Sequence, residues 1–465
     1  MIPLPISERE SGLQRGLGKT QVVMIGLGGA IGTGLFMGSG LAIGYAGPAV
    51  IVSYALAGFV ALVMVFSLSE MAVVHPTAGS FGTYAETYLN PWAGFVVRYT
   101  YWLAQVIAIG GEAVAAGLYM AFWFPGVPVW MWALGFCLLL LYVNSRSVSN
   151  FGTIEAWFAL IKVAAIVLFI ILGAASIFGV RHPLPLGFHN LGGLPGGFFP
   201  KGLSGVWFAV IVGVFSFNGI EVIAVTSGEV RDPRSAIPAA LRTMVVRLFL
   251  FYVLAVSIIV TVVPWTATGV QVVAQSPFVT VFQRSGIRHA AGIMNFVVIS
   301  AALSSMNTNI YLCSRMLFSL SRGRYAPQLL GTLSAKGVPL AAVVLSGGCI
   351  LVAAAVSIAT PNAYGYLLGV ALFAAILVWM FILASHLSFR RHHRAVDLPV
   401  RMPLFPWMQY VGLLMLAAIL VTMGLDRTFY VSWAYGVPWL LLVSAAYFVW
   451  KARRQRAAAP RAVLP

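Results

Sequence analysis

The chain has 465 residues, of which 60% are hydrophobic and only 8% are charged, and its formal net charge is +17. Soluble domains carry roughly 25% charged residues, so this composition excludes a soluble globular protein and indicates an integral membrane protein. The excess of Lys and Arg does not indicate nucleic-acid binding, because these residues are scattered through short links between apolar segments. The three cysteines, Cys137, Cys313 and Cys349, lie in apolar segments and suggest neither a disulfide framework nor a metal site.

Segments apolar enough to cross a bilayer, which takes about 20 residues, recur about twelve times. We expect spans at 20–44, 49–74, 92–124, 127–147, 151–178, 203–228, 237–263, 290–320, 339–358, 364–389, 404–425 and 431–450. An even number places both termini on one side. The links on the opposite side carry few basic residues, namely Arg181, Lys201, Arg284, Arg288 and Arg427. The positive-inside rule therefore predicts cytoplasmic termini.

The first span contains the stretch IGLGGAIGTGLFMGSG, residues 25–40, in which glycine is unusually frequent. Glycine weakens a helix because its backbone has more freedom to lose. One explanation is close helix packing, since Gly28 and Gly32 form a small-xxx-small pair. The other is a discontinuous helix, in which an unwound stretch turns its free N–H and C=O groups toward a ligand.

The sixth span, GVWFAVIVGVFSFNGIEVIAVTSGE at 205–229, is interrupted as well, because it carries Ser216, Asn218, Gly219 and Glu221 in its middle. Such residues at bilayer depth are costly unless they face a cavity or protein. Two interrupted spans five helices apart indicate two inverted five-helix repeats with a binding site at their interface. A zwitterion suits this site: its carboxylate would meet N–H groups of residues 29–34, and its ammonium would meet carbonyls at the sixth-helix break.

Five segments carry a resemblance to a known family. They are GLGGAIGTGLFMGSG with AIGYAGPAV, SLSEMAVVHPTAGSFGTYAE, FGTIEAWFALIKVAAI, FSFNGIEVIAVTSGEVRDPRSAIPAAL and SRMLFSLSRGRYAP. In this order they resemble bacterial amino-acid permeases of the amino acid–polyamine–organocation (APC) superfamily, above all its amino acid transporter (AAT) subfamily. The resemblance covers almost the whole chain. It does not identify the substrate, because the subfamily takes up γ-aminobutyric acid, aromatic amino acids, proline, lysine, asparagine and similar compounds.

The resemblance implies an all-α integral membrane protein with a LeuT-type core, built as a 5+5 inverted repeat with discontinuous helices 1 and 6. We expect a cytoplasmic N-terminal segment at 1–19 and a ten-helix core at 20–389, with repeats at 20–180 and 201–389. Two extra helices follow at 402–450, and a basic cytoplasmic tail at 451–465. The resemblance further implies secondary active transport by alternating access, usually with a coupling proton and without another cofactor.

The resemblance also implies positions for the substrate. The break of helix 1 would hold the substrate carboxylate at Ile31, Gly32, Thr33 and Gly34. Two aromatic residues at the helix 6 break, Phe215 and Phe217, would cover the site. Asn218, next to Gly219, either touches the substrate side chain or caps the broken helix.

Three polar residues deep in predicted spans are candidates for coupling. Lys162 either snorkels to the interface or pairs with Glu155, or it is a titratable ammonium. In some members of the superfamily a lysine at the matching place sits where sodium binds in sodium-coupled relatives, which favours the third interpretation. Glu112 is a second proton site, a substrate contact or a structural partner. Ser304 belongs to a polar stripe on the eighth span that either bonds between helices or faces helices 1 and 5.

Together with the resemblance, these residues predict a proton-coupled amino-acid importer in the inner membrane of a bacterium. An exchanger or uniporter of the same fold is the alternative, and a transporter-like nutrient sensor or the membrane subunit of a complex is an alternative of another class. An enzyme has little support, because no metal-ligand cluster, phosphate loop or nucleophile constellation is present. The expected partners are a small-molecule amino acid and, for the RRHHR run at 390–394, anionic membrane lipid. Oligomeric state stays open.

Overall fold

The computed structural model describes residues 10–180, 187–267, 289–349, 363–393, 398–426 and 429–458, together with residues 278, 281, 282 and 355. Within these ranges the chain is helical and contains no β-strand beyond one isolated bridge between Leu17 and Val230. Eight helices in the described part of the chain are long and apolar enough to cross a membrane. The protein is therefore a multi-pass helical membrane protein.

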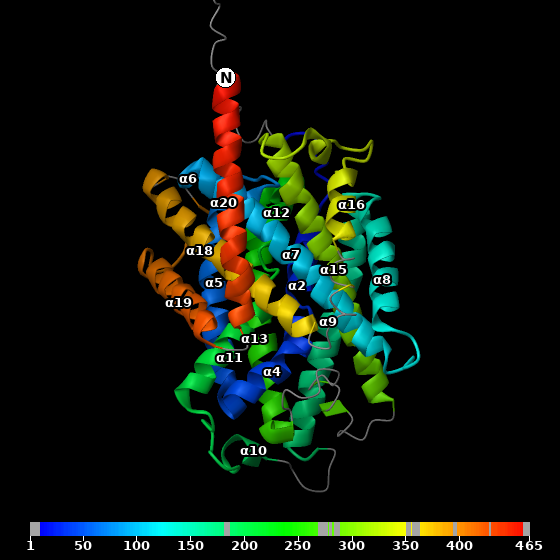
Figure 1. Cartoon of the computed structure of the whole chain (residues 1–465). Helices are drawn as coiled ribbons and strands as arrows, with labels where there is room; N and C mark the ends of the chain where they lie inside the picture. The colour runs from blue at the N-terminus through cyan, green and yellow to red at the C-terminus, as the bar shows by residue number, and fades with distance from the viewer. Residues whose placement is uncertain are drawn as a thin grey trace, which may run out of the picture.

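The first half of the bundle follows the predicted spans closely. Its helices are α2 (Lys19–Ala30), α3 (Thr33–Phe36), α4 (Gly38–Ala46), α5 (Val50–Val74), α6 (Ser80–Tyr88), α7 (Pro91–Met120), α8 (Val129–Asn144), α9 (Val148–Ile177) and α10 (His189–Gly192). The short helices α6 and α10 lie at opposite ends of the bundle (Figure 1) and were not among the predicted spans.

The second half agrees with the predicted spans in the same way. Its helices are α11 (Gly202–Ser216), α12 (Val222–Thr226), α13 (Pro233–Val262), α15 (Ala290–Arg322), α16 (Leu340–Gly348), α18 (Ala363–His392), α19 (Trp407–Leu425) and α20 (Tyr430–Ala458). The predicted ninth span, 339–358, lies outside the described residues from 350 onward, except for residue 355. The total of twelve spans and the inverted repeat remain predictions.

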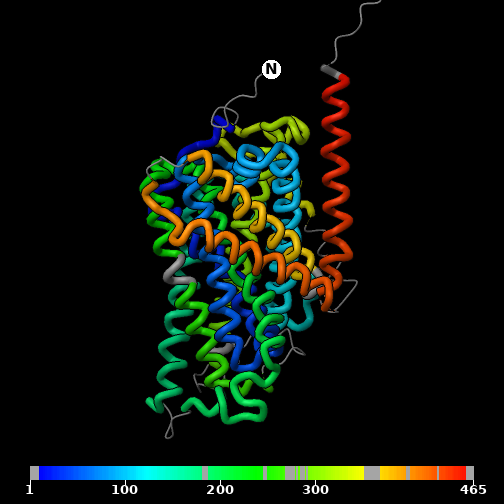
Figure 2. Tube along the Cα trace, turned by 90° about the vertical axis from the view of Figure 1, so that its left-hand side faces the viewer, coloured from blue at the N-terminus to red at the C-terminus, as the bar shows by residue number. Residues whose placement is uncertain are grey.

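The centre of the bundle is formed by α7, which packs on α15 and α18, and by α2, which packs on α9 and α13. These central helices are mostly buried, whereas α9, α19 and α20 each present large apolar side chains outward, such as Trp157, Leu414 and Leu441. Helix α20 stands at the side of the bundle (Figure 2). An apolar outer surface of this kind is suited to lipid, because lipid chains do not penalise exposed apolar side chains.

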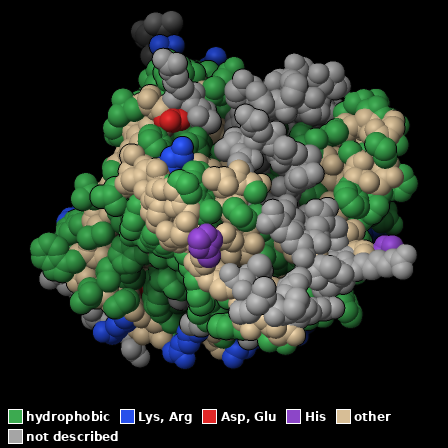
Figure 3. Space-filling view, turned by 90° about the horizontal axis from the view of Figure 1, so that it is seen from below, with side chains coloured by type: hydrophobic (Ala, Val, Ile, Leu, Met, Phe, Trp, Pro, Cys, Tyr) green, Lys and Arg blue, Asp and Glu red, His purple; other side chains and the backbone are tan. Residues whose placement is uncertain are grey.

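Both described chain ends, residue 10 and the end of α20, lie at the same end of the bundle, the upper end in Figures 1 and 2. This placement agrees with an even number of spans. On the lower face, seen in Figure 3, most visible side chains of the described residues are apolar or uncharged. Of the basic residues predicted for that side, Arg181, Arg284, Arg288 and Arg427 lie outside the described residues.

The N-terminal segment, residues 10–18, lies against the upper end of the bundle. The Glu10 carboxylate is buried and accepts hydrogen bonds from the N–H of Gly79 at 2.8 Å and from the hydroxyls of Thr83 and Ser319. Farther along, Leu17 is fully buried and forms the bridge to Val230, just after α12. The segment therefore fixes the chain where it enters α2.

Two of the membrane-embedded segments are broken, as the sequence indicates. Between α2 and α3 the backbone is extended at Ile31 and Gly32. Between α11 and α12 the chain turns through Gly219, whose φ is +98°. A Cβ atom on Gly219 would lie 2.4 Å from the carbonyl oxygen of Gly29, so the two breaks contact each other backbone to backbone. Only glycine combines this positive φ with so close an approach.

Candidate functional site between the two helix breaks

A small pocket lies where the two breaks meet. Its walls come from both breaks and from α7 and α15, and they include Gly29, Gly32, Gly34, Glu112, Phe215, Asn218, Gly219, Ser305 and Asn309. The glycines leave room for the pocket: a Cβ atom on Gly32 would lie 2.6 Å from the Glu112 carboxylate and 3.0 Å from the Ser305 hydroxyl. The pocket is thus polar at one wall and backbone-lined at another.

The Glu112 carboxylate accepts a hydrogen bond from a backbone N–H that was predicted to bind the substrate. The backbone N–H of Thr33, the first residue of α3, donates to both carboxylate oxygens of Glu112, at 3.2 and 3.3 Å. Glu112 is 5% exposed and belongs to the wall of the pocket. The backbone N–H of Thr33 at the break of the first helix is therefore already hydrogen-bonded to a carboxylate of the protein itself.

Glu221, not Asn218, caps the second break. The Glu221 carboxylate accepts the N–H of Gly219 at 3.1 Å and the hydroxyl of Tyr101 at 3.1 Å. The side-chain oxygen of Asn218 is buried and has no hydrogen-bond partner. Of the two roles open to Asn218, capping is thus absent from this structure, while its amide lies at the pocket wall.

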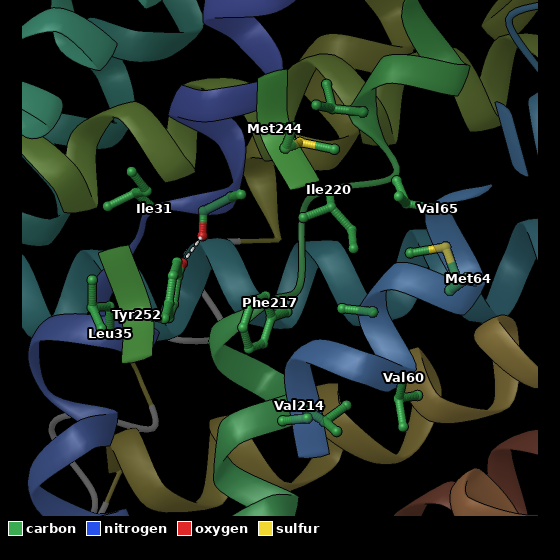
Figure 4. Close-up of a cluster of buried hydrophobic side chains, with 14 of the residues drawn as sticks. Ile31, Leu35, Val60, Met64, Val65, Val214, Phe217, Ile220, Met244 and Tyr252 are labelled. Carbon is green, nitrogen blue, oxygen red and sulfur yellow. Dashed lines mark hydrogen bonds between the residues drawn. The ribbon is translucent and has the colours of Figure 1, made fainter. Parts of the chain in front are cut away.

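The two phenylalanines of the second break lie in different places. Phe215 lines the pocket. Phe217 is 2% exposed and stacks on Tyr252, with ring centroids 4.6 Å apart. It lines a separate apolar cavity with Val65, Ile220 and Met244 (Figure 4). The pair predicted to cover one site therefore divides between two cavities.

Tyr252 on α13, which the sequence analysis missed, connects the two broken helices, and Figure 4 shows its hydrogen bond to the first of them. Its hydroxyl lies 2.7 Å from the carbonyl oxygen of Ala30 and 2.8 Å from that of Ser216. A hydroxyl carries one proton, so it donates to one of these carbonyls at a time. The available signal was a tyrosine inside an apolar span, because a buried tyrosine hydroxyl normally has a partner.

Replacing Tyr252 by phenylalanine is expected to lower the free energy of unfolding by about 1–3 kcal/mol, because the two buried carbonyls lose the one side-chain donor that they share. The measurement is thermal unfolding of the purified protein in detergent. The matched control is Tyr410→Phe on α19, since Tyr410 is exposed. Equal melting temperatures for both variants would contradict the bridging role.

Lys162 on α9 lies directly against the first break. It is fully buried, and its ammonium donates to the carbonyl oxygens of Gly28 and Ile31, the latter at 2.9 Å, and to the Ser304 hydroxyl at 2.7 Å. An ammonium has three N–H donors, so all three are used. This geometry satisfies the charged form and does not correspond to snorkelling, in which the charged group reaches water.

Glu155 lies on the same helix, two turns before Lys162, and its carboxylate faces the Lys162 ammonium. Its carboxylate is 3.9 Å from the Lys162 ammonium, and it accepts hydrogen bonds from the Ser304 hydroxyl and from the Asn307 amide. A Cβ atom on Gly28 would lie 2.4 Å from this carboxylate. The absence of a side chain at Gly28 thus allows the Glu155 carboxylate of α9 to approach α2 closely.

The structure therefore gathers most of the predicted residues but sorts them into two neighbouring groups. Gly32, Gly34, Phe215, Asn218, Gly219 and Glu112 line the pocket. Lys162 lies behind the first break and contacts its backbone, and Ser304 accepts a hydrogen bond from Lys162. Ile31 connects the groups, because its carbonyl accepts a hydrogen bond from Lys162 while the next residue, Gly32, borders the pocket.

A polar pocket between two broken helices, deep in a bundle of membrane helices, is the architecture of a membrane transporter. The chain belongs to the amino acid permease family, whose family model matches residues 21–458.

Similar proteins align with this chain over nearly their full length. The uncharacterized amino acid permease YtnA of Bacillus subtilis is 40% identical, over 95% of this chain and 96% of its own. The γ-aminobutyric acid permease of Bacillus subtilis is 39% identical, over 90% of each chain. The aromatic amino acid transport protein AroP of Escherichia coli O6:H1 is 36% identical, over 94% of this chain and 95% of its own.

Proposed function

We propose that this protein imports an amino acid across the inner membrane by proton symport, through alternating access of a site between the two helix breaks. The relatives named above include permeases of γ-aminobutyric acid and of aromatic amino acids, which supports an amino acid as the substrate. The proposal includes a LeuT-type arrangement with about twelve spans. It also places the upper end, with the basic residues of α20, in the cytoplasm.

The observation that carries proton coupling is the position of Lys162. Its ammonium holds two carbonyls of the first break, at Gly28 and Ile31, as a bound cation would. A neutral amine has only two N–H groups and directs a lone pair at its surroundings. Loss of the proton would therefore weaken the hold on these carbonyls, since hydrogen bonds from a charged donor are roughly twice as strong as those from a neutral one, and this links protonation to the movement of α2.

Glu112 supplies a second link, between the proton and the substrate. A substrate carboxylate that binds the Thr33 N–H must share the place now taken by the Glu112 carboxylate. Two carboxylates at one site do not readily both carry a charge. We expect Glu112 either to take up a proton or to turn away when the substrate binds. Proton uptake would favour binding on the more acidic side of the membrane.

Uptake into proteoliposomes tests the proposal. Labelled amino acids, including γ-aminobutyric acid and the aromatic amino acids, are offered with and without an inward proton gradient. Symport predicts accumulation of one group of substrates that collapses when an ionophore dissipates the gradient. Transport that appears only after the lumen is preloaded would replace symport by exchange. Downhill equilibration that ignores the gradient would indicate a uniporter, and absence of both transport modes would favour a sensor.

A further inference from the structure

A continuous series of buried polar side chains connects Lys162 with the end of α8. The Lys162 ammonium donates to the Ser304 hydroxyl, and that hydroxyl donates to Glu155. The Asn307 amide donates to the other Glu155 oxygen at 3.1 Å, and Asn144 donates to Asn307 at 2.8 Å. These five side chains are all at most 4% exposed. So many polar groups in a row at membrane depth indicate more than packing.

The series leads toward the upper end of the bundle. Glu155 precedes Lys162 by seven residues, so its Cα atom lies about 10 Å closer to the start of α9, while the carboxylate and the ammonium are 3.9 Å apart. The start of α9 is near the N-terminal segment, because a Cβ atom on Gly152 would lie 2.9 Å from Leu17. The last member, Asn144, is the final residue of α8, just before the link to α9. Lys162 therefore has a titratable neighbour on the side from which a proton would leave.

We propose that Glu155 is the residue to which Lys162 passes the coupling proton, through the Ser304 hydroxyl, before the proton reaches the cytoplasm; this inference rests on the proposed function. Ser304 is suited to the transfer because it accepts from Lys162 and donates to Glu155 at the same time. The function proposed above assigns no proton-transfer role to Glu155.

The transfer balances as follows. One N–H bond of the Lys162 ammonium breaks as its proton moves to the Ser304 oxygen, while the Ser304 proton moves to the Glu155 oxygen. The products are a neutral amine, an unchanged hydroxyl and a neutral carboxylic acid. Glu155 then gives its proton to water entering from the upper end when the bundle opens there, and it becomes a carboxylate again.

This step removes both buried charges together. Before the transfer, the ammonium and the carboxylate stabilise each other at 3.9 Å. A neutral Lys162 without a nearby acceptor would instead leave Glu155 as an uncompensated buried carboxylate, which is costly. The transfer avoids this state while the bundle is closed, because Glu155 becomes a carboxylate again only when water from the upper end reaches it. It also weakens the hold on the carbonyls of Gly28 and Ile31, since a neutral amine donates weaker hydrogen bonds than an ammonium does.

The test compares Glu155→Gln with the wild type in proteoliposomes. A glutamine side chain keeps the size and an acceptor oxygen but does not take up a proton. We expect gradient-driven accumulation to fall by about 100-fold or more, and its dependence on lumenal pH to disappear. Substrate affinity, measured by equilibrium binding, is expected to stay within about threefold, or 0.7 kcal/mol, because Glu155 does not line the pocket. Glu155→Asp, which keeps a carboxylate, is expected to recover part of the pH dependence.

A second pair of variants keeps the inference testable if Glu155→Gln does not fold. Ser304→Ala removes the hydroxyl between Lys162 and Glu155, whereas Ser304→Thr keeps one. We expect the alanine variant to lose gradient-driven accumulation and the threonine variant to retain it. Equal accumulation by both, or wild-type accumulation by Glu155→Gln, would overturn the relay. If the wild type itself shows no proton-driven uptake, the proposed function fails instead, so the two failures are distinguishable.

Discussion

Replacement of Lys162 by methionine is expected to abolish proton-driven uptake and to destabilise the protein. The variant leaves the Gly28 and Ile31 carbonyls without their ammonium donor and leaves the Glu155 carboxylate without its charged partner. Removal of one member of a buried ion pair costs about 3–5 kcal/mol, because the other charge stays buried and uncompensated. Uptake in proteoliposomes and thermal unfolding in detergent measure the two effects separately.

The double variant Lys162→Met/Glu155→Gln separates stability from coupling. Since it removes both charges, we expect its melting temperature to recover toward that of the wild type while proton-driven uptake stays absent. Lys336→Met, at an exposed position in the loop before α16, is the matched control and should change neither property. Unchanged gradient-driven uptake in Lys162→Met would exclude Lys162 from coupling.

Replacement of Gly32 by leucine is expected to block substrate binding in a protein that still folds. The backbone at Gly32 is extended, with φ −118° and ψ −158°, and therefore accepts a side chain. The new Cβ atom would displace the end of the Glu112 side chain, 2.6 Å away, and the rest of the leucine would enter the pocket. We expect substrate affinity to fall by about 100-fold or more, because the site tolerates little displacement of bound groups.

Equilibrium binding of the substrate found in the uptake assay measures this effect. Gly135→Leu is the matched control, because Gly135 lies at an exposed position on α8, where a new Cβ atom would have no neighbouring group within 4 Å. We expect Gly135→Leu to bind as the wild type does. Full binding by a well-folded Gly32→Leu would place the carboxylate site away from the first break.

The sequence was a good guide to the breaks because their causes are local. The glycines of residues 25–40 and the polar residues after Phe215 are poor choices for a continuous membrane helix, wherever the rest of the chain lies. The breaks at Ile31–Gly32 and at Gly219 agree with this expectation. The Lys162–Glu155 pair could also be predicted from the sequence, because two turns of one helix place both residues on the same face.

The partners of the site residues were harder to predict from the sequence, because they belong to helices that are far apart in the chain. No local pattern connects Glu112 on α7 with the Thr33 N–H, or Tyr252 on α13 with the carbonyls of Ala30 and Ser216. The position of Phe217 has the same explanation. It depends on how the chain turns between α11 and α12, where Phe217 stacks on Tyr252 of α13.

By itself, the sequence determined that this protein is a helical membrane protein, where most of its helices lie and which two are interrupted, because hydropathy and backbone preference act within each segment. Only the tertiary structure decided which side chains close the breaks, and that Lys162 and Glu112 act on adjacent stretches of one backbone. The reason is that lipid and protein neighbours are both apolar, so the sequence of a span carries little information about the direction in which each face points.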